Sequence, residues 1–136
     1  RLLRAIVLYD AEGKCRKCGK ISARGRGGSL ETAHIFPKGA HPSMRYRLDN
    51  VLALCHHCHF HFAHSNPIGF TDWVQTELGS AALERLRAVA NAPGRVDREA
   101  DRLYLTVEAQ RRGLPLFVDI AGQKKHTRSR KCNPKR

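Results

Sequence analysis

The spacing of hydrophobic and polar positions predicts one helix, then two short strands, then a series of helices. The first helix ends before Gly13 and has one apolar face at helical spacing. That face comprises Leu2, Leu3, Ile6 and Val7. Residues 30–36 and 51–55 are short apolar runs typical of strands, and a turn-rich segment leads from one to the other.

Helical spacing returns after the second strand. A short helix is expected to begin around Cys58 and to end before Asn66. The next helix runs from Pro67, which suits a first turn, to Gly79, which suits a stop. A third helix follows, with Ser80 as its predicted N-cap.

The last predicted helix lies within residues 96–113 and carries one apolar stripe, which is interpreted as core or packing surface. The stripe consists of Ala100, Leu103, Tyr104 and Val107. Together the elements predict an α+β fold in a single domain of residues 1–120. Its core covers about 13–66, and a helical extension covers about 67–113.

The chain is strongly basic, with 25 Lys and Arg against 12 Asp and Glu and a formal net charge of +13. Residues 121–136 carry seven basic and no acidic residues and are expected to form a disordered basic tail. This balance indicates a polyanionic partner, most commonly nucleic acid. The chain has no apolar run of about eighteen residues, so no membrane span is expected.

The five cysteines form two close pairs and one single residue. Cys15 and Cys18 make one CxxC motif, Cys55 and Cys58 make another, and 36 residues separate the motifs. Zinc favours tetrahedral sulfur sites, in which each CxxC turn supplies two ligands. A structural zinc is therefore predicted to join the start of the chain to its middle and to stabilise a domain with little core of its own. Cys132, in the tail, is interpreted as a free thiol.

Four cysteines complete a zinc site, yet the same region also contains five histidines between residues 53 and 67. With the zinc site in place, the order "CRKC … TAHIFP … LDNVLALCHHCHFHFAH" resembles the HNH endonuclease family with a four-cysteine zinc site, whose catalytic core is called ββα-metal. The resemblance runs from about Cys15 to His64. The helices that follow are similar to the extension of phage and prophage members, which implies a cytoplasmic protein in a bacterial host cell.

The resemblance implies a metal-dependent endonuclease that acts on DNA, with RNA the less favoured substrate. A one-metal mechanism would hydrolyse phosphodiester bonds and leave 5′-phosphate and 3′-hydroxyl ends. Three residues carry over as catalytic: His34 as general base, Asn50 as the residue that fixes the loop or the histidine, and His59 as a ligand of the catalytic ion. Histidine ligation leaves this ion open among Mg²⁺, Mn²⁺, Ni²⁺ and Zn²⁺.

The chain departs from the commonest family pattern at Ala33. Many members have an Asp or His metal ligand at this position, directly before the general base. Glu31 lies two residues earlier, on the same side of a strand, and is an alternative ligand either directly or through water.

A second departure is the spacing of the histidines that follow the fourth cysteine. His59 and His64 are five residues apart, and on a regular α-helix they would diverge by about 140°. A π-bulge would bring them onto one side. The resemblance to phage-type members, which have the same five-residue spacing, implies His59 with His64 as the metal ligands, and His61 with His64 is the geometric alternative.

Several basic residues are expected to contact nucleic acid because they flank the proposed site or lie in the tail. They are Arg24, Arg26, Arg45, Arg47, Lys124 and Lys125. The competing interpretation of the chain is a non-catalytic, zinc-stabilised DNA-binding module with an HNH-like fold, which Ala33 favours. The sequence leaves the oligomeric state open.

Overall fold

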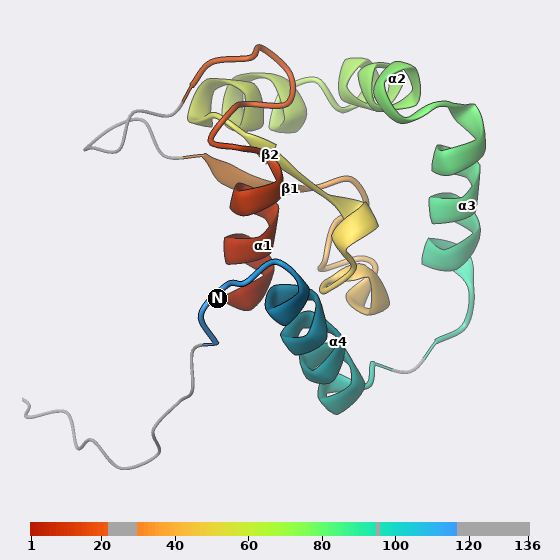
Figure 1. Ribbon diagram of the computed structural model, residues 1–136. Coiled ribbons are helices and arrows are strands. Elements are labelled where there is room, and N and C mark those ends of the chain that lie inside the picture. The colour runs from red at the N-terminus through yellow and green to blue at the C-terminus, as the bar shows by residue number, and fades with distance from the viewer. Residues whose placement is uncertain (22–29, 95, 117–136) are drawn as a thin grey trace, which may run out of the picture.

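The computed structural model describes residues 1–21, 30–94 and 96–116, with a two-stranded antiparallel sheet at its centre and helices around it (Figure 1). In chain order the elements are α1 (Leu2–Asp10), β1 (Glu31–His34), η1 (Pro42–Met44), η2 (Leu48–Asn50), β2 (Val51–Leu54), η3 (His57–His64), α2 (Pro67–Leu78), α3 (Ser80–Asn91) and α4 (Arg98–Arg111). This arrangement confirms the predicted α+β class. Within these ranges, no helix combines the length and the apolar content needed to cross a membrane.

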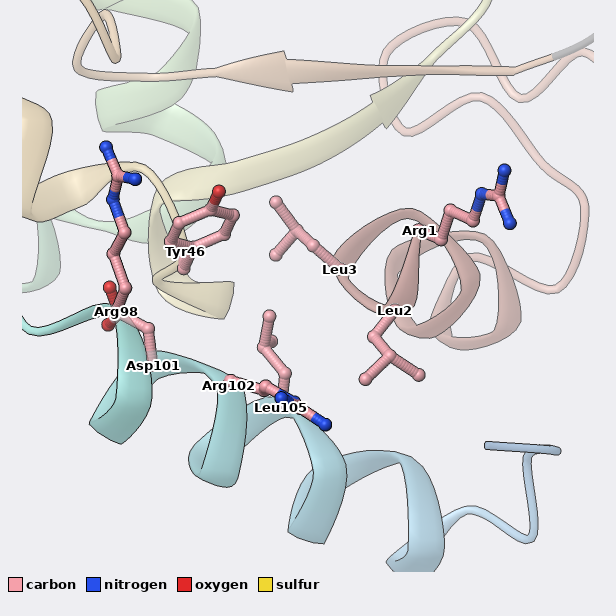
Figure 2. Close-up of a pocket in the computed structure, with 8 residues that line it drawn as sticks. All are labelled: Arg1, Leu2, Leu3, Tyr46, Arg98, Asp101, Arg102 and Leu105. Atoms are coloured by element: carbon pink, nitrogen blue, oxygen red, sulfur yellow. The ribbon is translucent and has the colours of Figure 1, made fainter. Parts of the chain in front are cut away.

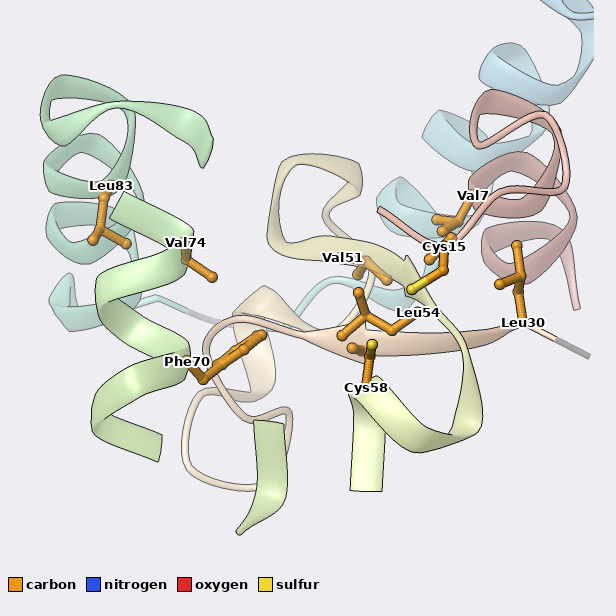
Figure 3. Packing of buried hydrophobic residues seen from close by; sticks show 11 residues of the cluster. Val7, Cys15, Leu30, Val51, Leu54, Cys58, Phe70, Val74 and Leu83 are labelled. Carbon is orange, nitrogen blue, oxygen red and sulfur yellow. The ribbon is translucent and has the colours of Figure 1, made fainter. Parts of the chain in front are cut away.

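The two strands pair in a register that runs from Glu31 opposite Leu54 to His34 opposite Val51. Strands of four residues are marginal by themselves, so the sheet depends on packing. Leu54 is fully buried at the centre of the main core, which extends from Val7 in α1 across the sheet (Figure 3). On the far side the core continues to α2 and α3, at Phe70, Val74 and Leu83.

The helix α2 begins and ends at its predicted signals. The Oδ1 atom of Asn66 accepts a hydrogen bond from the backbone N–H of Gly69 at 3.0 Å, which caps the helix start. Gly79 has a φ of +82°, which favours glycine, and it separates α2 from α3. The predicted N-cap at Ser80 is wrong, because Gly79 is the N-cap of α3 and the Ser80 hydroxyl accepts a hydrogen bond from Nε2 of Gln75.

The helix α4 packs against α1, but not through the predicted apolar stripe. Leu105 and Ala109 are buried against Ile6. All four members of the stripe are exposed instead, namely Ala100, Leu103 (64%), Tyr104 (45%) and Val107 (37%). The Arg112 guanidinium donates to both carboxylate oxygens of Asp10, at 2.7 and 2.9 Å. The face of α4 that meets α1 is thus the narrow one formed by Leu105 and Ala109.

The four cysteines of the two CxxC motifs lie together, with all four Sγ atoms within 4.8 Å of one another. Cys15 and Cys58 are buried in the main core (Figure 3). Burial raises the pKa of Cys15, but backbone hydrogen bonds from residues of both motifs outweigh it and bring the pKa down to about 7. The group is thus positioned to bind a metal ion, in agreement with a structural zinc.

The turn within the first CxxC motif also contacts β2, η3 and α2. The backbone N–H of Arg16 donates to the carbonyl oxygen of Ala53 at 2.9 Å. The Nε atom of the same arginine lies 2.6 Å from a carboxylate oxygen of Glu77. The Lys17 ammonium lies over the ring of Phe62, 4.0 Å from its centroid. One short turn therefore holds together elements that are far apart in the sequence.

Cys55→Ala is expected to abolish folding, because one of four metal ligands is lost. Structural zinc contributes on the order of 10 kcal/mol to small zinc domains, which is comparable with the whole stability of such a domain. Zinc analysis by mass spectrometry and circular dichroism should show loss of both zinc and helical structure. Cys132→Ala, which leaves all four cysteines of the two CxxC motifs in place, should keep zinc and fold. A folded, zinc-bound Cys55→Ala chain would contradict the assignment.

Candidate active site

His34 lies at the end of β1, and one of its ring nitrogens is engaged in a hydrogen bond. Its Nε2 atom is 3.0 Å from the carbonyl oxygen of Arg45. Because a carbonyl only accepts, Nε2 carries the hydrogen and Nδ1 keeps its lone pair. Burial lowers the pKa of His34, and the charges of Lys38 and Arg45 act in the same direction, against the opposing effect of the carbonyl. The ring is therefore neutral near pH 7 and can accept a proton at Nδ1.

Asn50 is fully buried between η2 and β2, and its hydrogen bonds all go to the loop that follows β1. Its Nδ2 donates to the carbonyl oxygens of Phe36 and Met44, both at 3.0 Å, and its Oδ1 accepts from the Phe36 N–H at 2.8 Å. Met44 directly precedes Arg45. Asn50 therefore holds the loop whose carbonyl binds His34, and does not hold the histidine itself.

The helix η3 is a π-helix, in which residues five apart come onto the same side. The Nε2 atoms of His59 and His64 lie 3.2 Å apart as a result. Two nitrogens bound to one ion at about 2.1 Å would be separated by about 3.0–3.4 Å. The pair thus has the spacing of two ligands of a single metal ion.

Glu31 contacts the other ring nitrogen of His59. Its two carboxylate oxygens lie 2.6 Å from Nδ1 of His59 and 3.0 Å from Nδ1 of His56. These hydrogen bonds lower the pKa of the Glu31 carboxyl, so it is ionised and accepts from both rings. This contact directs the lone pair of His59 Nε2 away from Glu31, as carboxylates do for histidine ligands of metals. His61 has its ring contacts with His56 and His57, at centroid distances of 6.3 and 5.2 Å.

A cleft of about 470 Å³ collects these groups, with His34, His59 and His64 in its lining. Lys38 and Thr71 also line it, and neither was selected from the sequence. Lys38 could have been selected from the sequence, because it is a basic residue four positions after the proposed base and lies in a turn-rich segment. In the described ranges the four cysteines are the only group of three or more metal-ligating side chains, so an ion at the histidine pair would keep positions for water and phosphate.

Residues 15–65 match the family model described as HNH endonuclease. This segment, which is less than half of the chain, is similar to HNH endonuclease domains. The segment contains the four cysteines, both strands and the three histidines of the cleft. The match confirms the resemblance seen in the sequence. The family indicates a nuclease that acts on nucleic acid. Comparisons with curated proteins and with solved structures gave no match.

The predicted nucleic-acid contacts differ in their surroundings. Arg45 is exposed, and its carbonyl binds the ring of His34. The Arg47 guanidinium donates to Asp49 at 2.6 and 3.0 Å, so its charge is partly neutralised within the protein. The other predicted contacts lie outside the described residues, namely Arg24, Arg26, Lys124 and Lys125.

Asn50→Asp should destabilise the loop that carries Arg45. Aspartate keeps the size and the acceptor of asparagine, but it cannot donate to two carbonyls and places a charge in a buried position. The expected loss in free energy of unfolding is roughly 3–5 kcal/mol, measured by urea unfolding of zinc-loaded protein. Asn91→Asp, at the exposed end of α3, is the matched control and should cost about 1 kcal/mol or less. Equal stability of the two variants would contradict this role.

Proposed function

We propose that the chain is a metal-dependent DNA endonuclease that cuts phosphodiester bonds in the cleft lined by His34, His59 and His64. One observation carries the proposal. The same cleft holds a neutral imidazole with a free Nδ1 and two Nε2 atoms 3.2 Å apart. The first group suits a general base, and the second suits a divalent-ion site. DNA is proposed over RNA from the family resemblance, and a net charge of +13 suits either polyanion.

His59 and His64 would hold the catalytic ion, with Glu31 keeping His59 in the tautomer that presents Nε2. A bound divalent ion supplies Lewis-acid stabilisation of the charge that grows on the leaving oxygen. Imidazole ligands accept Mn²⁺, Ni²⁺ and Zn²⁺ as well as Mg²⁺, so this pair of ligands suits several ions.

In the proposed reaction, Nδ1 of His34 removes a proton from water as the water oxygen attacks phosphorus. The new P–O bond forms while the bond from phosphorus to the 3′ oxygen breaks, which leaves a 5′-phosphate and, after protonation, a 3′-hydroxyl. The carbonyl of Arg45 keeps its hydrogen bond to Nε2 and so orients the ring. Lys38, in the lining of the same cleft, attracts the phosphate.

The competing proposal is a non-catalytic, zinc-stabilised DNA-binding module with the same fold. Ala33 favours it, because this buried side chain offers no ligand atom at a position where many HNH members have one. Glu31 does not replace that ligand directly while both of its oxygens accept from histidine rings. Cutting assays separate the two proposals.

Glu31→Gln should weaken the binding of a divalent ion at the histidine pair by about 10–100-fold. The amide holds the Nδ1–H of His59 less strongly than the carboxylate does. Calorimetric titration of zinc-loaded protein with Mn²⁺ measures the change, since Mn²⁺ prefers oxygen and nitrogen to thiolate ligands. Glu84→Gln is the control, because Glu84 pairs with Arg87 on α3 and should leave the affinity unchanged. Equal Mn²⁺ affinity in both variants would count against the orienting role.

His34→Ala should slow the nicking of supercoiled plasmid by about 10²–10⁴-fold, the usual contribution of a general base. EDTA should stop the wild-type reaction, and His57→Ala, on an exposed part of η3, is the matched control. The base works only when neutral, and burial lowers the pKa of His34, so the wild-type rate should rise with pH through a midpoint below about 6.5.

A wild-type chain that cuts with none of Mg²⁺, Mn²⁺, Ni²⁺ or Zn²⁺ would overturn the endonuclease proposal. The result would favour the competing proposal of a non-catalytic DNA-binding module. Matched DNA and RNA substrates in the same assay decide the choice of nucleic acid.

A further inference from the structure

A second cleft, of about 570 Å³, opens between α1 and α4 (Figure 2). It has no lining residue in common with the histidine cleft. Three leucines give it an apolar lining, namely Leu2, Leu3 and Leu105, and arginines supply most of its charge. Figure 2 shows Arg98 and Arg102 on successive turns of α4 beside this opening. A cleft with apolar and cationic parts suits an anion that carries an organic group.

Arg98 and Arg102 make no ion pair with any described residue, unlike the arginines at the other end of the same helix. There, Arg111 and Arg112 both pair with Glu108, at 2.6 and 2.7 Å. Two like charges four residues apart on a helix repel each other. The start of α4 also carries Asp97, Glu99 and Asp101, but only Asp101 lines the cleft. An anion in the cleft would relieve the repulsion between the two arginines.

Asp101 is the acidic residue in the lining of this cleft. It makes no hydrogen bond or ion pair with Arg98 or Arg102 in the described structure. Burial raises the pKa of Asp101, and the nearby charge of Asp97 raises it further. With three arginines against one aspartate, the lining of the cleft keeps an excess of positive charge.

Tyr46 connects the cleft with the candidate active site. Its ring lines the cleft (Figure 2), and it directly follows Arg45, whose carbonyl binds His34. The segment between β1 and β2 thus contributes to both clefts, with Lys38 in the lining of one and Tyr46 in the lining of the other. An aromatic ring with neighbouring arginines is the usual means of holding nucleotides without sequence preference.

We propose that the α1–α4 cleft binds a stretch of the nucleic-acid substrate beyond the bond that is cut, with Arg98 and Arg102 on backbone phosphates and Tyr46 against a sugar or base. This inference rests on the proposed function, from which it takes the substrate class. The chain's own tail is a poor occupant, because residues 121–136 carry seven basic and no acidic side chains.

The test measures binding to a labelled DNA duplex at several KCl concentrations, in a His34→Ala background that leaves the DNA uncut. Each phosphate contact contributes about 0.9 to the slope of log affinity against log salt. Arg98→Ala/Arg102→Ala should lower that slope by about 1–2 and weaken binding about tenfold at low salt. Arg85→Ala/Arg111→Ala removes the same charge outside the cleft and should keep the slope. Arg98→Lys/Arg102→Lys should also retain it.

An equal slope in the two alanine variants, with circular dichroism showing both folded, would overturn the cleft inference. The plasmid assay on the chain with His34 intact separates this failure from that of the proposed function. If that chain cuts DNA while the slopes are equal, only the cleft inference fails. If the slope falls as expected but the chain cuts nothing, the cleft binds nucleic acid and the endonuclease proposal alone fails.

Discussion

The convergence of four cysteines is the constraint on which the rest of the structure depends. Their Sγ atoms lie within 4.8 Å of one another, although the two motifs are separated by 36 residues. Cys55 follows β2 directly, and Cys58 lies within η3, next to His59. A metal ion bound by the thiolates would therefore fix the start of the helix that carries the proposed catalytic ligands. The structural site would take no part in the chemistry, yet it would set the position of the groups that do.

The π-helical form of η3 is the second condition for the site, and tertiary contacts stabilise it. π-helices are rare and usually short, so a run from His57 to His64 needs support at both ends. At its start the rings of His56 and His59 donate to the carboxylate of Glu31 in β1, at 3.0 and 2.6 Å. Near its end Phe62 lies against the rings of Phe70 and Trp73, with centroids 6.2 and 6.3 Å away. These contacts hold the geometry that brings His59 and His64 together.

Sequence patterns predicted the features that depend on residues close to one another in the chain. The CxxC motifs, the two strands and the order of the histidines led to the α+β fold and the HNH resemblance, and both are confirmed. The contacts of Glu31 with His56 and His59 could not be predicted from local patterns, because they span 25 and 28 residues. The rotation of α4 was predicted wrongly for the same reason. Its apolar stripe is local, whereas the Arg112–Asp10 contact between α4 and α1 spans 102 residues.

The helices outside residues 15–65 also pack against the segment that positions the candidate active site. Leu48 packs in the main core and also in the cluster where Ile6 of α1 meets Leu105 of α4. Tyr46 belongs to that second cluster as well. The segment between β1 and β2 is therefore held from within by Asn50 and from outside by α1 and α4. Because the same segment supplies the carbonyl that holds His34, the position of the proposed base depends on packing well beyond the HNH motif.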